Sequence, residues 1–133
     1  MTDKEILLDM HQKIIQAHLE TNVQSWLDME SDEYISANGG VISYESKAER
    51  RAGREPYLRA TTFNEYRDVV EPIVKISEDG TLGWVIVQVK VSGVQKTQSG
   101  AEVPVAFESA WIELYEKRNG RWLCVGNVSN MKS

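Results

Sequence analysis

The stretch that decides the fold is residues 106–129, AFESAWIELYEKRNGRWLCVGNVS. At its centre, Asn119-Gly120 is a strong signal for a two-residue β-hairpin turn, in which both residues have positive φ. Counting outward from this turn places Tyr115 opposite Cys124. The further pairs expected on that face are Glu113 with Gly126, Trp111 with Val128 and Ser109 with Asn130. Since side chains alternate along a strand, the other face carries Ala110, Ile112, Leu114, Leu123, Val125 and Asn127.

Both faces of this hairpin are largely apolar, so both need a cover. An antiparallel sheet in a small protein normally leaves one face to water. We therefore expect the chain's own helices to cover the Glu113 face, and a second copy of the chain to cover the other face. The residues predicted for that homodimer interface are Ile112, Leu114, Leu123 and Val125. If Asn127 and Glu108 line the cavity instead, the two assignments exchange places.

The rest of the chain predicts helices first and strands afterwards. A capping box at Thr2 to Glu5 begins a helix that runs to about Glu20. A second capping box at residues 46–49 begins another helix, which Gly53 and Pro56 are expected to weaken or break. From residue 61 onward the apolar period is two, which indicates long strands. This order predicts an α+β domain with helices over the concave face of a curved antiparallel sheet.

Size and charge limit the function classes. The 133 residues, 41% hydrophobic and 26% charged, are expected to form a single domain spanning 1–133. The net charge of −5 argues against a nucleic-acid partner. The basic run at residues 49–54 is interpreted as a solvated helix face. Without a signal peptide or an 18-residue apolar run, we expect no membrane partner and a cytoplasmic location.

Cofactor motifs are missing from the sequence. Cys124 is the only cysteine, so a thiol cluster for a metal is excluded. His11 and His18 lie seven residues apart on one helix, roughly 10 Å, which is too far to share one metal ion. The sequence also lacks dinucleotide-binding, phosphate-loop, zinc-protease and serine-hydrolase motifs. We therefore expect no metal and no other cofactor.

A curved sheet under helices encloses a pocket, which is the default site for a small molecule. Polar groups to orient a ligand and aromatic walls to contact it are available from several predicted elements. The predicted ligand-binding residues are Trp26, Asn38, Tyr57, Trp111, Glu113 and Asn130. Glu113 is also a candidate general base, since burial would raise the pKa of its carboxyl group. His18, near the end of the first helix, is the other candidate catalytic residue.

Several segments together resemble the nuclear transport factor 2-like superfamily, in its SnoaL-like branch. They are Trp26-Leu27-Asp28, Asn38-Gly39-Gly40, residues 46–50, residues 84–89 and the ending Gly120-Arg121-Trp122 with Val128-Ser129. The resemblance covers nearly the whole chain. It implies a cone-shaped, cystatin-like α+β barrel that is commonly dimeric through the outer face of the sheet. In such proteins the interior of the cone serves ketosteroid isomerase, polyketide cyclase or dehydratase activity, or plain binding.

The resemblance leaves the question of catalysis open. The aspartate base of ketosteroid isomerase-like members falls at or beside Asn38, and an amide cannot abstract a proton at neutral pH. The preferred hypothesis is a homodimer that binds a small apolar or weakly polar ligand. One alternative is a cofactor-independent isomerase, dehydratase or polyketide cyclase-like enzyme. Another is a protein-interaction module that binds a different partner through the outer face.

Overall fold

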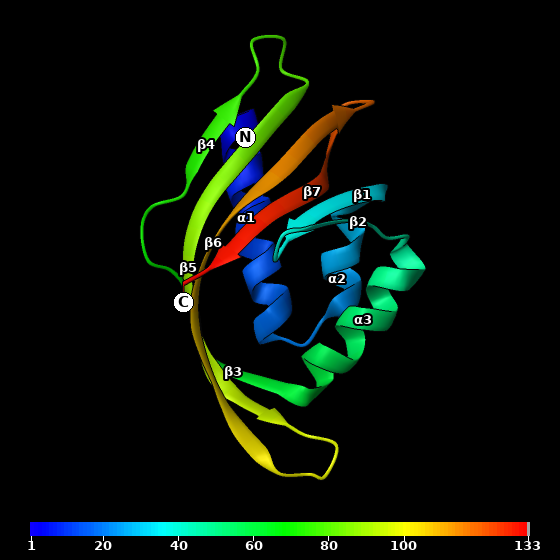
Figure 1. The fold of residues 1–133 in the computed structure, drawn as a ribbon. Coiled ribbons are helices and arrows are strands. Elements are labelled where there is room, and N and C mark those ends of the chain that lie inside the picture. Colours follow the sequence, from blue (N-terminus) through cyan, green and yellow to red (C-terminus); the bar gives the residue numbers. More distant parts are fainter. Residues whose placement is uncertain (133) are drawn as a thin grey trace.

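The computed structural model describes residues 1–132; Ser133, the last residue of the expected domain, lies outside the described residues. These residues form an α+β fold, as predicted, with three helices on the concave side of a curved sheet (Figure 1). The helices are α1 (Asp3–Leu19), α2 (Val23–Asp28) and α3 (Lys47–Ala60). The strands are β1 (Glu30–Asn38), β2 (Val41–Tyr44), β3 (Thr61–Asp68), β4 (Ile73–Ile76), β5 (Leu82–Lys96), β6 (Glu102–Arg118) and β7 (Arg121–Met131).

Two helices begin at the capping boxes that the sequence predicts. Both capping boxes form, with the Thr2 and Ser46 hydroxyls each accepting a backbone N–H three residues ahead. The predicted break in the second of these helices is wrong, because α3 continues through Gly53 and Pro56. Pro56 removes one helical hydrogen bond, but the following turn is held by Leu58, which is buried. Tertiary packing here outweighs the local penalty of the proline.

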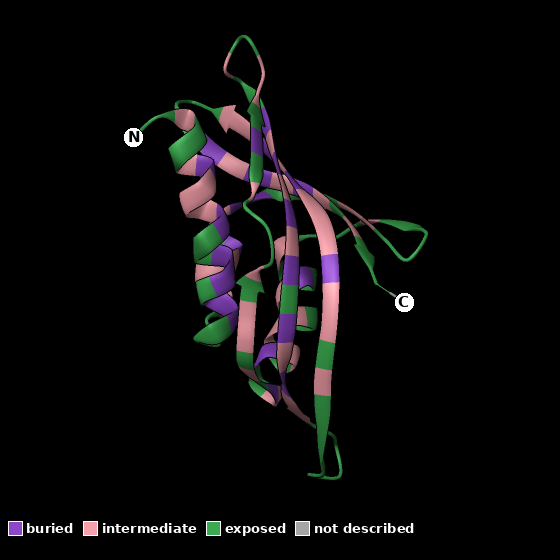
Figure 2. Cartoon of the chain, turned by 90° about the vertical axis from the view of Figure 1, so that its left-hand side faces the viewer, coloured by how far each residue is buried: buried purple, intermediate pink, exposed green. Residues whose placement is uncertain are grey.

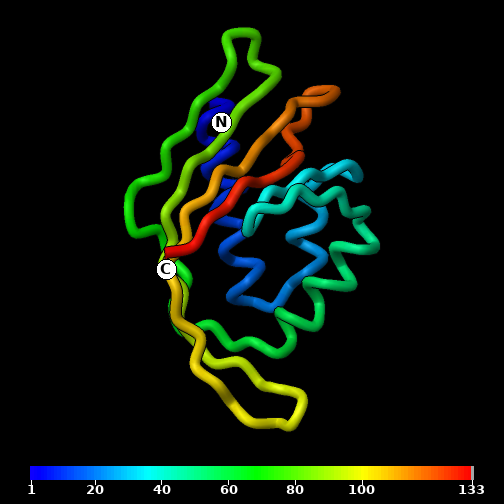
Figure 3. The backbone as a smooth tube through the Cα atoms, viewed as in Figure 1, coloured from blue at the N-terminus to red at the C-terminus, as the bar shows by residue number. Residues whose placement is uncertain are grey.

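The sheet has the strand order β2-β1-β7-β6-β5-β3, with β4 also pairing with β5. It bends around the helices, and over residues 1–132 it does not close into a barrel (Figures 1 and 3). The expectation of an antiparallel sheet needs one correction, since β1 and β7 are parallel. Parallel neighbours require a long crossover, which the whole segment between these two strands supplies.

The hairpin of β6 and β7 departs from the predicted register after its first few pairs. The turn has φ of 51° at Asn119 and 78° at Gly120, and Tyr115 pairs with Cys124 as predicted. A bulge then shifts the register by one residue, so the three pairs predicted beyond it are wrong. The observed pairs are Leu114 with Gly126, Glu113 with Asn127, Trp111 with Ser129 and Ser109 with Met131.

Close approach of β1 explains why glycine occupies the position just after this bulge. A Cβ atom on Gly126 would lie 2.3 Å from the carbonyl oxygen of Ile35, so a larger residue would push the strands apart. The one-residue shift exchanges the two sides of β7 beyond this point. Asn127 and Ser129 therefore share the face of Glu113, while Asn130 turns to the other face.

The core lies between α1 and the inner face of the sheet. Alternate residues of β5, Val85, Val87, Val89 and Val91, are almost completely buried there, together with Leu7 of α1. Figure 2 shows this alternation along the long strands, whose tips are exposed. None of the helices formed by residues 1–132 has the length and apolar character needed to cross a membrane.

Candidate functional site

A cavity of about 320 Å³ lies between the helices and the inner face of the sheet. Its walls come from α1, α2 and α3 on one side and from β1, β3, β6 and β7 on the other. Its volume is at the lower end of the range for small-molecule sites. The lining residues are Ile14, His18, Trp26, Glu30, Tyr34, Ser36, Asn38, Glu45, Arg54, Tyr66, Ser109, Trp111, Glu113, Cys124, Asn127 and Ser129.

The cavity brings together most of the residues that the sequence analysis singled out. Those on its wall are His18, Trp26, Asn38, Trp111 and Glu113. Two predicted ligand-binding residues lie outside it. Tyr57 packs edge-on against Phe63, with 6.1 Å between ring centroids, because α3 continues unbroken past Pro56. Asn130 is exposed, because the bulge in β7 turns its side chain away from the Glu113 face.

Glu113 is held by three hydrogen-bond donors at the inner end of the cavity. Its Oε2 atom accepts from His11 Nδ1 at 2.6 Å and from Trp111 Nε1 at 2.8 Å. Its Oε1 atom accepts from the Tyr115 hydroxyl at 2.7 Å. A carboxylate can accept about four hydrogen bonds, so one site remains for a ligand. The Glu113 side chain is therefore fixed in orientation and nearly saturated.

Behind Glu113, His11 joins it to a second carboxylate. His11 is fully buried, and its Nε2 lies 2.7 Å from Asp68 Oδ1, while the Gln12 amide donates to Asp68 Oδ2 at 2.9 Å. Burial alone would lower the pKa of His11, but the hydrogen bonds and charges of Glu113 and Asp68 outweigh it and raise the pKa to about 9. At neutral pH an imidazolium thus links α1 to β6 and β3.

Sequence reasoning missed Asp68 and considered His11 only as a possible metal ligand. Asp68 lies 57 positions from His11 at the end of β3, and no local motif connects the two residues. The available signal was His11 itself. Its place among the apolar residues of α1 required a partner on the sheet, since buried polar groups are almost always hydrogen-bonded.

His18 is a neutral acceptor in the aromatic part of the cavity. Its Nδ1 donates to the carbonyl of Ile14 at 2.7 Å, which leaves the lone pair on Nε2; no hydrogen bond within residues 1–132 uses that atom. The ring lies 4.2 Å from Trp26 and 4.6 Å from Tyr66 between centroids. Burial, helped by the positive charge of Arg54, lowers the pKa of His18 to about 4. His18 is therefore a hydrogen-bond acceptor and a weak base.

Two arginines of α3 share one buried carboxylate of β1. Glu30 Oε1 lies 3.1 Å from Arg50 Nε and 2.8 Å from Arg54 Nη1. The Arg54 guanidinium also lies over the Trp26 ring, 3.9 Å from its centroid. The interpretation of residues 49–54 as a solvated face is thus wrong for Arg50, which is 3% exposed. The sequence of this segment has many charged residues and few apolar ones. It therefore does not show which charged side chain turns toward a buried partner.

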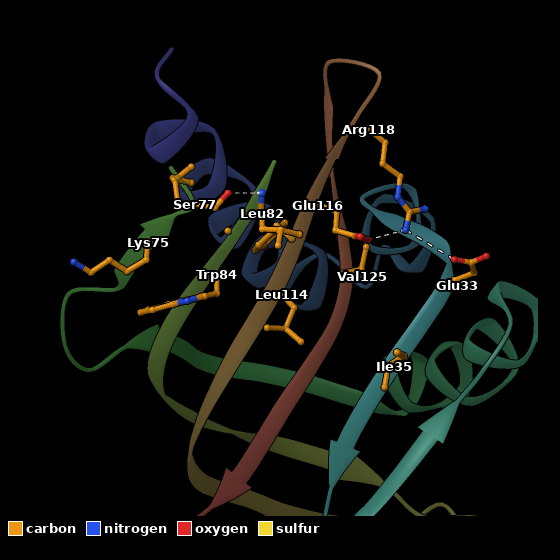
Figure 4. A pocket seen from close by; sticks show the side chains of 13 residues that line it. Glu33, Ile35, Lys75, Ser77, Leu82, Trp84, Leu114, Glu116, Arg118 and Val125 are labelled. Carbon is orange, nitrogen blue, oxygen red and sulfur yellow. Dashed lines mark hydrogen bonds and ion pairs between the residues drawn. The ribbon is translucent and has the colours of Figure 1, made fainter. Parts of the chain in front are cut away.

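A second depression, of about 680 Å³, lies on the opposite, outer face of the sheet. Its floor is apolar, formed by Ile35, Trp84, Leu114 and Val125 (Figure 4). Charged side chains stand at its rim, where Arg118 pairs with Glu116 and Glu33. Of the predicted interface residues, Leu114 and Val125 line this groove, and Ile112 and Leu123 are half-buried beside it.

Paired strands extend this outer face into two rows that cross the sheet, called the outer rows below. The first row is Tyr44, Ile35, Gly126, Leu114, Trp84 and Lys75. The second row is Ile42, Ala37, Val128, Ile112, Ile86 and Ile73. All but one of these twelve residues are nonpolar or aromatic. Several are well exposed, including Ile42 at 65% and Tyr44 at 74%. Contiguous apolar surface of this kind marks an interaction site.

Comparisons with known proteins place the fold. No protein-family model matches the sequence, and no curated protein matches it. Among solved structures, an NTF2-like protein from Cytophaga hutchinsonii has a TM-score of 0.77 at 14% identity, covering 99% of this chain and 100% of that one. A candidate dehydratase of the NTF2-like family from Streptomyces avermitilis has a TM-score of 0.79 at 8% identity, covering 98% and 97%.

A third similar structure is a candidate calcium/calmodulin-dependent kinase II association domain from Exiguobacterium sibiricum. Its TM-score is 0.70 at 13% identity, and the match covers 96% of this chain and 91% of that one. Identities this low carry the fold and nothing about activity. The narrower SnoaL-like assignment stays a prediction. This chain therefore shares the fold of these NTF2-like proteins.

Proposed function

We propose that this protein is a homodimer that binds a small polar molecule in the cavity beneath its helices. The observation that carries the proposal is an unused buried acceptor: Asn127 is a lining residue of the cavity, and its buried Oδ1 atom has no hydrogen-bond partner within residues 1–132. Leaving a buried polar atom unpaired costs about 1–3 kcal/mol, which a ligand that donates a hydrogen bond would recover. The sequence predicted an apolar or weakly polar ligand, but the cavity lining is polar enough to favour a polar one.

The outer rows support the homodimer. Six strands at a spacing of about 4.8 Å span about 24 Å, which is wide enough for an interface of standard size. A two-fold axis through this face would set the same apolar rows against each other, as an isologous dimer requires. The resemblance to a candidate association domain is compatible with such assembly. The alternative is a different protein partner on this face.

A second candidate function is a cofactor-independent isomerase, dehydratase or cyclase. The observation that favours it is Glu113, an ionisable group in the cavity wall that His11 orients from behind. A base that is positioned in this way is what proton abstraction needs. His18 is less suited to this role, since its lowered pKa makes it a weak base. A bound compound that is recovered chemically unchanged favours the binding function, and a compound that is converted favours the enzyme.

The binding proposal is tested by blocking the cavity. Ser36 lines the cavity from β1, and Ser36→Trp is expected to fill part of its 320 Å³ with an indole. A panel of small aromatic compounds is screened by saturation-transfer NMR against the full chain. We expect contacts with the unmodified protein that Ser36→Trp loses and that Gln16→Trp keeps, because Gln16 is exposed on α1. Equal binding to all three proteins, or to none of them, would contradict the proposal.

A further inference from the structure

The cluster around Glu30 carries one positive charge in excess. One buried carboxylate faces two guanidinium groups, those of Arg50 and Arg54. Nη1 and Nη2 of Arg50 donate to backbone carbonyls of Ser31, Asp32 and Glu45, whereas its buried Nε has no hydrogen-bond partner within residues 1–132. Arg54 differs, because its one hydrogen bond within residues 1–132 is the bond from Nη1 to Glu30. Arg54 lines the cavity and Arg50 does not, so Arg54 is the arginine of this cluster whose free N–H donors a ligand can reach.

Arg54 presents these donors to the cavity in a fixed plane. It reaches the cavity from α3, which lies beside α2 (Figure 1), and its guanidinium carbon lies 3.9 Å from the centroid of the Trp26 ring, a contact that restricts its movement. A planar guanidinium offers two parallel N–H groups, the geometry that matches a carboxylate. Burial is the main cause of the lowered pKa of His18, and the positive charge of Arg54 adds to it as a smaller cause.

The acidic residues of the lining do not cancel this charge. Glu113 and Asp68 share the imidazolium of His11, at 2.6 and 2.7 Å, and Glu113 also accepts from Trp111 and Tyr115, which leaves it one free acceptor position. Glu30 is the carboxylate that the two arginines already share. Glu45 is exposed at the rim, where water screens its charge. Among the charged groups of the lining, Arg54 is thus the cation whose N–H donors are only partly used.

Two other polar groups of the cavity are unpaired hydrogen-bond acceptors, so a ligand that pairs with them needs a hydrogen-bond donor. Asn127 Oδ1 and His18 Nε2 are both acceptors, and within residues 1–132 neither has a hydrogen-bond partner. Aromatic side chains form the walls between them, namely Trp26, Tyr34, Tyr66 and Trp111. A flat ring with a hydroxyl at the end remote from its acid group would satisfy both requirements.

We infer that the cavity binds a small aromatic hydroxy acid, with its carboxylate on the Arg54 fork and its hydroxyl donating to one of the two unused acceptors. This inference rests on the proposed binding function and names its ligand class. The pairing is charge-assisted at one end and a neutral hydrogen bond at the other. Loss of the carboxylate should therefore weaken binding more than loss of the hydroxyl.

Three matched compounds test the ligand class by isothermal titration calorimetry with the full chain. They are 4-hydroxybenzoate, its neutral analogue 4-hydroxybenzamide, and benzoate, which lacks the hydroxyl. We expect 4-hydroxybenzoate to bind roughly 10- to 100-fold more tightly than the amide, the range that a charge-assisted hydrogen bond gives. Benzoate should bind with intermediate affinity.

Variants of α3 test the assignment to Arg54. Arg54→Gln should remove the preference for the acid over the amide, whereas Arg54→Lys, which keeps the charge without the fork, should retain part of it. The matched control is Arg51→Gln, since Arg51 lies on the same helix and pairs with Glu55 outside the cavity. If Arg54→Gln fails to fold, the affinities of the unmodified chain and of Arg54→Lys for the acid and the amide still test whether Arg54 binds the carboxylate.

The outcomes separate this inference from the proposed function. If 4-hydroxybenzoate and 4-hydroxybenzamide bind with equal affinity, and Ser36→Trp binds neither, the carboxylate assignment is wrong. The cavity would then remain a binding site. A preference for the acid that survives in Arg54→Gln would overturn the role of Arg54. If neither these compounds nor the wider panel bind, the proposed function falls and the ligand class falls with it.

Discussion

Replacing His11 with alanine is expected to lower the free energy of unfolding by about 3–5 kcal/mol, because the change leaves two carboxylates without their shared cation. Glu113 is 2% exposed, so its lost partner cannot be replaced by bulk water. The matched control is Gln12→Ala, which removes a hydrogen bond to the same Asp68 from the exposed side. That control should cost about 1 kcal/mol or less. Urea denaturation measures both values.

The same substitution should change how stability depends on pH. The pKa of His11 is raised from 6.5 to about 9 in the folded chain, so its stabilisation is complete below pH 6.5 and is lost as pH rises to 9. This contribution amounts to about 3 kcal/mol. The pKa of His18 is lowered from 6.5 to about 4, so its contribution is lost as pH falls over that interval. Stability should be greatest near pH 6.5, and His11→Ala should abolish the alkaline decline.

A double-mutant cycle distinguishes lost charge pairing from lost packing. The double variant His11→Leu/Glu113→Leu should lose less free energy of unfolding than the sum of the two single variants, because it no longer buries the Glu113 carboxylate without its cation. Additive costs would contradict the paired state of these two residues. So would a His11→Ala variant no less stable than Gln12→Ala.

Leu114→Arg is expected to weaken the proposed dimer by about 100-fold or more. Leu114 lies in the middle of the first outer row, between Gly126 and Trp84. In an isologous dimer the new charge enters the interface twice, and a buried unpaired charge costs several kcal/mol. Sedimentation velocity over a range of concentrations measures the change. The dimer of the unmodified chain should become a monomer in the variant.

A control on the same strand shows whether position matters. Glu102→Arg changes the charge at the exposed start of β6, away from the outer rows, and should leave the dimer intact. If the unmodified chain is already a monomer at high concentration, the homodimer is wrong and the alternative of a different partner on this face is favoured. If Leu114→Arg remains dimeric, the copies meet elsewhere.

The hairpin illustrates how far local signals reach. Asn119-Gly120 predicts its own turn because positive φ at both positions is a property of those two residues, and the pairs nearest the turn follow from it. The bulge before Gly126 could not be predicted in the same way. It depends on the backbone of β1, which approaches Gly126 after a separation of about 90 residues in sequence. Asn130 was misplaced, and Asn127 left to the alternative arrangement, for this reason.

The site shows the same division. Alternation along β6 was enough to place Glu113, Trp111 and Tyr115 together on one face, because that pattern is set by the strand itself. The partners of Glu113 and Glu30 come from helices. Which rotation of α1 and α3 brings His11, Arg50 and Arg54 to the sheet is decided by packing of the whole core, so the basic run of α3 was read as solvated.

By itself, the sequence determined the α+β class, the helix starts, the final turn and the presence of two apolar sheet faces, since each depends on neighbours within a few residues or on a period along one element. Only the tertiary structure decided the parallel pairing of β1 with β7, the side of β7 that lines the cavity, and the charge clusters around His11 and Glu30. Those features arise where segments distant in sequence meet. Their energies depend on burial and on partners that local pattern does not contain.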